Sequence, residues 1–337
     1  MKYAGIDLHS NNCVVSVIDE TDRVVAERRV GNEIEQVIAV LQPYRSELAG
    51  VVVESTFNWY WLVDGLQERG FIVHLANTAA MQTYSGLKHS DDRDDARHLA
   101  HLLRLGVLPT GFIYPKEQRA TRDLARQRMR LVQARSRSII AVENVWSRQT
   151  GGRLSGNQVK RLTGDDIEAM ELHADVRLGL QAQVALVGAL EQQIDALEKR
   201  LQERVRLQAG YRLLTTVPGI GATLAAVIAL ETGPIDRFAA AGDFASYARC
   251  VDSALISNGK KKGEGNVKNG NRYLAWAFVE AAHFACRYCE QARRFYERKR
   301  AQTNTAVATK ALAHKLARAC YHMLKRGAPF DVARCFG

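Results

Sequence analysis

The sequence has no apolar run long enough to cross a membrane, and it has few cysteines. Its most apolar stretch, residues 223–230, is far shorter than the roughly 20 residues of a spanning helix. The first residues, MKYAGIDLHS, lack the basic start and sustained apolar segment of a signal peptide. Six cysteines scattered over 337 residues do not form the disulfide framework of a secreted domain. These absences predict a soluble cytoplasmic protein.

One Cys-x-x-Cys pair, Cys286 and Cys289, raises the alternative of a zinc site. The pair lies in a stretch with helical periodicity, and the sequence has no second pair to complete four ligands. Buried or partly exposed thiols are therefore the favoured interpretation.

The charge is divided unequally along the chain. The net charge is +11, yet residues 1–115 carry ten Lys and Arg against fifteen Asp and Glu. The excess of positive charge therefore lies in the remainder. An acidic N-terminal part joined to a basic remainder indicates a polyanionic partner, which one part binds and the other part modifies chemically.

The first third of the chain reads as alternating strands and helices. Short apolar runs at 3–8, 13–18 and 24–30 predict three strands, and helical periodicity follows at 33–48. Further strands are expected at 51–54 and 70–76, with helices at 59–68 and 92–105. This order predicts an α/β layer built on a mixed sheet.

The middle of the chain reads as long basic helices. Residues 116–161 hold twelve Lys and Arg against three acids. Arg126, Arg130 and Arg137 fall at helical spacings and predict a stripe that faces a phosphate backbone. Residues 175–205 carry a heptad-like seam, which fits packing within the chain or coiled-coil pairing of two copies. We expect the seam to join two copies through Leu190, Ile194, Leu197 and Leu201.

Two glycine-containing segments follow in the last third. Val217-Pro-Gly219-Ile-Gly221 lies between two apolar helical stretches, as in a helix-hairpin-helix, whose glycines let backbone amides approach a phosphate. A tight turn between two helices is the alternative. Residues 257–271 form a loop rich in Gly, Asn and Lys, and helices resume from Tyr273.

Four acids stand out by their positions. Asp7 and Glu54 each end an apolar strand, and Asp92 and Asp95 lie three residues apart at the start of a helix, on one face. Such carboxylates on a sheet flanked by helices make an oxygen-rich site for Mg²⁺, or for Mn²⁺ in its place. Two such ions stabilise the attacking and leaving oxygens of phosphodiester chemistry. Helix capping is the alternative for the two helical acids.

The opening Gly-Ile-Asp also begins actin-like and sugar-kinase ATPases. Those proteins need a glycine-rich phosphate loop after the aspartate, whereas Asp7 is followed here by Leu-His-Ser-Asn-Asn. The ATPase interpretation fails on that point.

The sequence resembles the DEDD transposases of bacterial insertion sequences, the insertion-sequence one-ten group of bridge-RNA-guided recombinases. Three features carry the resemblance. The first is GIDLHS with VVVEST and DDRDDARHLA, which matches the RuvC-like carboxylate pattern of the family. The second is the stretch at 213–251, which matches the C-terminal transposase domain, and the third is the serine-containing loop and helix at 257–282. Together they span nearly the whole chain in the order of the family.

The resemblance implies a fold, a chemistry and partners. Asp7, Glu54, Asp92 and Asp95 would bind the metal, with Asp91 and Asp94 outside the tetrad. A catalytic serine would attack a DNA phosphate, and a structured RNA would guide the enzyme to donor and target DNA. The RuvC-like domain of one subunit would meet the serine domain of another, so a homo-oligomer, a dimer or a tetramer, is implied.

The serine region departs from the pattern of the family. Many members have a paired-serine run, whereas this chain reads Asp252-Ser-Ala-Leu-Ile-Ser257-Asn-Gly259, which favours Ser257 over Ser253. Neighbouring cations would neutralise part of the phosphate charge; they are Lys260, Lys261, Lys262 and Lys268. Without the resemblance, Ser257 would be read as a turn residue.

We therefore expect three parts. An α/β RuvC-like (RNase H-like) domain occupies 1–110, a basic helical and coiled-coil segment 111–208, and a mainly α C-terminal domain with the serine loop 209–337. The expected function is RNA-guided DNA strand cleavage and exchange in the cytoplasm, at the nucleoid. The alternatives are a structure-selective junction nuclease without serine chemistry, and a non-catalytic nucleic-acid-binding scaffold.

Overall fold

The computed structural model describes residues 1–81, 91–253, 255–265 and 269–337. The chain divides into two compact units, one of residues 1–116 with 253–269 and the other of residues 117–252 with 270–337. No helix of the described residues combines the length and the apolar character needed to cross a membrane. The division into parts at 110 and 208 stays a prediction.

The first unit is built on a six-stranded mixed sheet with strand order β3-β2-β1-β4-β5-β6. The strands β1, β2 and β3 pair antiparallel, β1, β4 and β5 pair parallel, and β6 pairs antiparallel with β5. The strands are β1 (Lys2–Leu8), β2 (Asn12–Asp19), β3 (Val24–Gly31), β4 (Leu48–Glu54), β5 (Val73–Ala76) and β6 (Thr110–Gly111). The helices are α1 (Ile34–Leu41), α2 (Tyr60–Glu68), α3 (Thr78–Met81) and α4 (Asp92–Arg104), with a 3₁₀ turn at Gln42–Tyr44.

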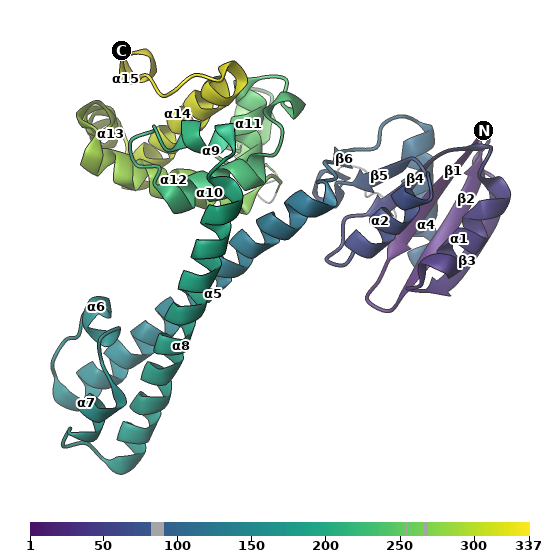
Figure 1. Ribbon diagram of the computed structural model, residues 1–337. Coiled ribbons are helices and arrows are strands. Elements are labelled where there is room, and N and C mark those ends of the chain that lie inside the picture. Colours follow the sequence, from purple (N-terminus) through teal and green to yellow (C-terminus); the bar gives the residue numbers. More distant parts are fainter. Residues whose placement is uncertain (82–90, 254, 266–268) are drawn as a thin grey trace. The chain divides into compact units, whose positions relative to one another are not determined.

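The two faces of this sheet are covered by different helices (Figure 1). Alternate strand residues such as Ile6, Val15 and Val53 pack in one apolar core with α1 and α2. The intervening residues face α4, where Val52 packs against Leu99. The predicted mixed α/β layer is confirmed, and it fits a RuvC-like N-terminal domain.

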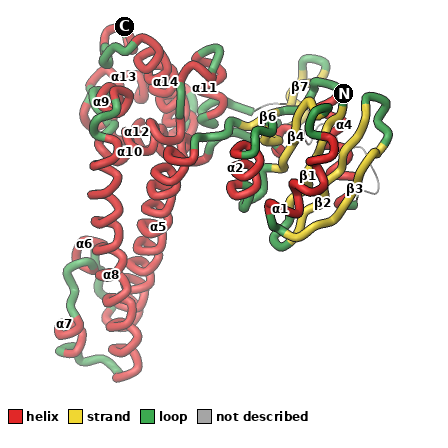
Figure 2. The backbone as a smooth tube through the Cα atoms, turned by 45° about the vertical axis from the view of Figure 1, so that its right-hand side comes forward, coloured by secondary structure: helices red, strands yellow, loops and turns green. Residues whose placement is uncertain are grey.

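Two long helices begin the second unit and lie side by side in both views (Figures 1 and 2). They are α5 (Lys116–Thr150) and α8 (Ala174–Val205), linked by α6 (Gly156–Val159) and α7 (Gly164–Glu168). Arg128 pairs with Glu198 and Arg135 with Glu191, so the helices run antiparallel.

The heptad-like seam of α8 is buried within one chain, which contradicts the expected pairing of two copies. Ile194 is 2% exposed and Leu201 is 4% exposed. Leu201 packs in a core that includes Ala125 of α5, while Leu190 and Leu197 are half-buried. The prediction was wrong because spacing identifies an apolar face and not the chain that covers it.

The rest of the second unit is a helical bundle around Phe244 and Phe278. Its helices are α9 (Ala209–Leu214), α10 (Ala222–Thr232), α11 (Ala241–Tyr247), α12 (Arg272–Tyr288), α13 (Glu290–Gln302), α14 (Thr305–Arg326) and α15 (Val332–Phe336), with a 3₁₀ turn at Ile235–Arg237. Between α11 and α12 in the chain, a hairpin of β7 (Leu255–Ser257) and β8 (Lys260–Gly263) belongs to the first unit.

Candidate active site

Strand pairing places Asp7 and Glu54 at neighbouring positions. Ile6 of β1 pairs with Val53 of β4, and the two strands are parallel, so the next residue of each lies at the same edge. Asp7 follows Gly5 by two residues and Glu54 follows Val52 by two residues. Because strand side chains alternate, both carboxylates lie on the face that α4 covers.

A glycine lets α4 approach this face closely. A Cβ atom on Gly5 would lie 2.0 Å from the carbonyl oxygen of Ala96 and 2.8 Å from the amide nitrogen of Ala100. Any side chain at this position would therefore separate the helix from β1. The absence of a side chain brings the first turn of α4, with Asp92 and Asp95, against the end of β1.

The other two acids of DDRDD cap the helix. Asp91 Oδ1 accepts hydrogen bonds from the amides of Arg93 and Asp94, both at 3.0 Å, and Asp94 returns a longer contact to the amide of Asp91. This capping box occupies Asp91 and Asp94 with the helix terminus. Asp92 and Asp95 remain for the carboxylate cluster.

The clustered carboxylates perturb one another. Burial, then a hydrogen bond with Asp7 and the charges of Asp7 and Asp95, raise the pKa of Glu54 to about 7. Partial desolvation and the charges of Asp7 and Asp92 raise the pKa of Asp95. Asp7 is 3% exposed, and its Oδ2 makes no well-aligned hydrogen bond among the described residues. The cluster thus carries more negative charge than its surroundings compensate, as expected of a cation-binding site.

Two basic side chains missed in the sequence approach this cluster. His9 Nε2 lies 3.1 Å from Asp7 Oδ2 and 3.2 Å from Asp92 Oδ2. Arg29 of β3 pairs with Asp92, and this hydrogen bond holds the pKa of the Asp92 carboxyl below its usual value. His9 could have been predicted from the sequence, because it follows Asp7 by two residues. The approach of Arg29 could not, because it depends on the register of β2 and β3.

Asp7, His9 and Asp92 each offer one ligand atom, and these atoms lie within 4.8 Å of one another. No other group of three such side chains occurs among the described residues, so Cys286 and Cys289 belong to no such group. Carboxylate oxygens with an unsatisfied Asp7 Oδ2 fit a hard divalent cation. The group therefore suits a divalent cation, and it shares Asp7 and Asp92, but not Glu54 or Asp95, with the predicted tetrad.

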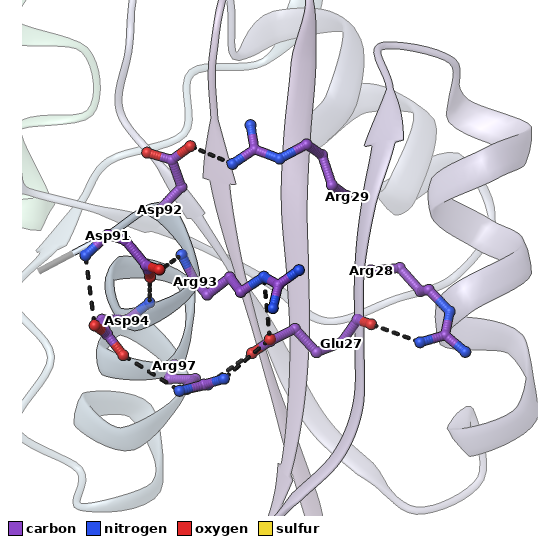
Figure 3. A network of polar contacts seen from close by, with 8 residues as sticks. All are labelled: Glu27, Arg28, Arg29, Asp91, Asp92, Arg93, Asp94 and Arg97. Atoms are coloured by element: carbon purple, nitrogen blue, oxygen red, sulfur yellow. Dashed lines mark hydrogen bonds and ion pairs between the residues drawn. The ribbon is translucent and has the colours of Figure 1, made fainter.

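Ion pairs anchor α4 to the edge strand β3 (Figure 3). Arg97 Nε donates to Glu27 Oε2 at 2.6 Å, and Arg93 lies 3.6 Å from the other oxygen of Glu27. Together with Arg29 and Asp92, these pairs fix the helix along its exposed side. They hold the register in which the first turn faces Asp7.

Ser257 is an exposed residue at the tip of the β7–β8 hairpin. It pairs with Lys260, and the two residues between them, Asn258 and Gly259, have φ values of 51° and 70°. Positive φ at both central positions is typical of a type I′ turn, which Asn-Gly favours. Ser257 makes none of the contacts described for the carboxylate cluster. Lys260 and Lys262 are exposed, while Lys268 and the side chain of Lys261 lie outside the described residues.

The predicted arginine stripe splits into two kinds of environment. Arg130 and Arg137 are exposed, but Arg126 donates to both oxygens of buried Glu231, at 2.6 and 2.8 Å. Asn271, the cap of α12, donates to the same carboxylate at 2.7 Å. Arg126 is therefore engaged within the protein, and the predicted phosphate contacts rest on the other two arginines.

The two glycines of the α9–α10 turn also differ. Gly219 has φ of 93°, and a Cβ there would lie 2.5 Å from the carbonyl oxygen of Ala281 and from the amide of Ala285 in α12. Gly221 is the cap of α10 and has open space around it. Helix packing thus explains Gly219, and Gly221 is the glycine with room for a ligand.

Comparison with known proteins identifies the family. Residues 4–147 match the model of DEDD transposases of the IS110 type, described as a transposase, and residues 211–297 match the model described as the transposase IS116/IS110/IS902 family. The chain belongs to the IS110 family of DEDD transposases. The two models cover the carboxylate-bearing sheet and the helices on both sides of the serine hairpin.

Individual relatives agree with this family. A probable family 20 transposase of Pseudomonas aeruginosa is 25% identical over 96% of this chain and 96% of its own length. The transposase for insertion sequence element IS1328 of Yersinia enterocolitica is 28% identical over 43% of this chain and 44% of its own length. An IS110 protein of Streptomyces coelicolor is 31% identical over 42% of this chain and 36% of its own length.

Proposed function

We propose that this IS110-family transposase cuts and exchanges DNA strands under the guidance of a structured RNA, with a metal-binding carboxylate tetrad and Ser257 as nucleophile. The observation that supports the metal site is that the charge of Asp7 contributes to the raised pKa values of both Glu54 and Asp95, while Asp7 and Asp92 offer ligand atoms within 4.8 Å of one another. Family membership makes DNA the substrate.

The residues of the chain take definite roles in this proposal. Asp7, Glu54, Asp92 and Asp95 hold Mg²⁺, or Mn²⁺ in its place, and His9 and Arg29 orient Asp7 and Asp92 from the rim. Bound metal supplies positive charge that stabilises the phosphoryl oxygens in the transition state. Exposed Lys260 and Lys262 add charge on the hairpin side.

The serine step balances without an added reactant. The Ser257 hydroxyl loses its proton and attacks phosphorus, a phosphoserine ester forms, and the leaving deoxyribose oxygen takes up a proton. Attack on this ester by the hydroxyl of another strand regenerates the serine and joins the new pair of strands. The bond energy is conserved in the ester, so exchange proceeds without hydrolysis.

A covalent adduct is the decisive readout for the serine. We expect wild-type protein to give a protein–DNA band in denaturing electrophoresis, and mass spectrometry to place the link on Ser257. Ser257→Ala changes an exposed turn residue, so it abolishes the adduct and leaves the fold intact, while Ser253→Ala retains the adduct. Mg²⁺-dependent cleavage by Ser257→Ala without loss of rate would favour the junction nuclease instead.

The carboxylates and the RNA are tested separately. Asp7→Asn and Glu54→Gln remove a ligand charge at nearly constant volume and should abolish cleavage while DNA binding persists. Cleavage at the wild-type rate by either variant would disprove the tetrad and leave a nucleic-acid-binding scaffold. RNA guidance predicts that a defined RNA copurifies and that exchange stops after ribonuclease treatment. Exchange by RNA-free protein would refute guidance alone.

Assembly as a homo-oligomer, a dimer or a tetramer, is part of the same proposal. Because Ile194 and Leu201 are buried inside one chain, the oligomer must use other surfaces than the α8 seam. Light scattering of the DNA-bound protein should report a mass of at least two chains, and a monomer active in strand exchange would contradict this.

A further inference from the structure

A groove of about 970 Å³ lies among α13, α14 and α15 in the second unit. Cations from all three helices line it: Lys299 of α13, Lys315, Arg318 and Arg326 of α14, and Arg334 of α15. One acid, Asp331, also lines the groove, and it accepts a hydrogen bond from the amide of Arg334 as the cap of α15. The lining is therefore strongly positive.

Among the residues that the structure describes, these five cations have no carboxylate partner. Within the described ranges, no ion pair joins Lys299, Lys315, Arg318, Arg326 or Arg334 to an acid. Lys315 instead lies over the rings of Phe295 and Phe336. The neighbouring Lys325, which does not line the groove, pairs with Asp236. On α14, the lysine outside the groove thus forms an ion pair, and the cations that line the groove do not, among the described residues.

Three arginines of the basic middle of the chain show the opposite pattern, whereas Arg130 and Arg137 are exposed. Arg126, Arg128 and Arg135 of α5 are each paired with a glutamate of the same unit. Their charge is largely compensated inside the protein, so it is less available to a partner. The groove, in contrast, gathers like charges around one hollow, which raises the free energy of the unbound folded state.

The positive charge of the groove also affects the pKa values of its two histidines, His314 and His322. Burial lowers the pKa of His322, and Arg326, Arg318 and Arg334 lower it further by charge repulsion. Burial also lowers the pKa of His314, followed by the effects of Arg318 and Lys315. Both imidazoles therefore stay neutral at physiological pH, and the groove charge comes from the lysines and arginines.

We propose that this groove binds a segment of the DNA phosphate backbone, as a second DNA contact separate from the carboxylate site. The family supplies DNA as the substrate, and unpaired Lys and Arg around one hollow are complementary to a row of phosphates. The proposal requires neither the serine chemistry nor RNA guidance. In this proposal, the cations of α13–α15 contribute more to DNA binding than those of α5.

The test neutralises the three exposed arginines of the groove, with Arg318→Gln, Arg326→Gln and Arg334→Gln in one full-length protein. Affinity for a labelled DNA duplex is measured by fluorescence anisotropy across a salt series, in EDTA so that no strand is cut. Loss of three phosphate contacts should reduce the slope of log affinity against log salt by about 3 and lower affinity at least tenfold. Lys325→Gln on the same helix removes one charge that is already paired and should leave both values unchanged.

A charge-conserving variant separates binding from folding. The triple change to lysine keeps the positive charge and should restore the salt slope, and circular dichroism should show the same helicity in every variant. An unchanged slope in the glutamine triple variant would overturn the proposal, as would an equal loss in Lys325→Gln. A loss confined to an RNA duplex of the same sequence would also overturn it. Because Ser257→Ala should bind with the wild-type slope, failure of the serine mechanism is told apart from failure of the groove.

Discussion

Glu54→Gln should stabilise the metal-free protein at pH 8 while it weakens the metal site. Burial, then the proximity of Asp7 and Asp95, raises the pKa of Glu54 from its ordinary value of 4.5 to about 7. For a carboxyl whose folded-state pKa is raised, the folded state holds its proton more tightly than the unfolded chain. That stabilisation is complete below about pH 4.5 and is lost as the pH rises through about 7.

The size of the effect follows from this difference. A shift from 4.5 to about 7 corresponds to about 3 kcal/mol of lost stability above both values. Glu54 is only partly buried, and solvent screening reduces this to about 1–2 kcal/mol. Glutamine keeps the shape and the hydrogen-bonding capacity of the protonated acid but cannot ionise. The melting temperature of the variant should therefore exceed that of the wild type by about 3–6 °C at pH 8.

Differential scanning fluorimetry with and without Mg²⁺ at pH 5 and pH 8 measures this. In EDTA, the variant should exceed the wild type at pH 8 and nearly match it at pH 5. Mg²⁺ should raise the melting temperature of the wild type at pH 8 by binding the folded state, and raise that of the variant much less. Glu68→Gln, an exposed acid of α2, should change neither quantity. A variant that melts at or below the wild type at pH 8 would refute the assigned repulsion.

Three further variants test the packing that positions the sites. Gly5→Ala places a methyl group 2.0 Å from an α4 carbonyl, so urea denaturation should show a loss of about 2–4 kcal/mol, and cleavage should cease. Arg126→Met leaves a buried glutamate without its cation and should cost about 3–5 kcal/mol by the same assay, whereas exposed Arg130→Met should cost almost nothing. Ile194→Asp should destabilise the chain instead of releasing folded monomers, and Leu186→Asp, 46% exposed, should leave both stability and mass unchanged by denaturation and light scattering.

The arrangement of the first unit was predictable because local signals agree there. Apolar runs of strand length, each ended by an acid, identified β1 and β4, and parallel neighbours place such acids at one edge. The spacing of Asp92 and Asp95 identified their common helix face. The sequence could not show that Gly5 brings this helix onto β1, because the clash it avoids involves residues more than 90 positions away.

Residues whose partners lie far along the chain were missed for the same reason. Arg29 reaches Asp92 from β3, a strand that is two places away from β1 in the sheet. Arg126 meets Glu231, more than one hundred residues later. Helical spacing grouped Arg126 with Arg130, but spacing carries no information on which tertiary partner a side chain meets.

Net charge and available charge are therefore different quantities in this protein. Residues 116–161 hold twelve Lys and Arg against three acids, and a stripe of these arginines was predicted to face a phosphate backbone. Antiparallel packing of α5 on α8 then pairs Arg128 and Arg135 with glutamates, which makes part of this charge less available to a phosphate, while Arg130 and Arg137 stay exposed. The groove of α13–α15 contains fewer cations, yet its arginines are unpaired within the described residues and gathered around one hollow. A cation that has no ion pair inside the protein loses none when it binds a phosphate, so it contributes more binding free energy. DNA affinity should therefore depend on the unpaired arginines more than on the number of basic residues in a segment.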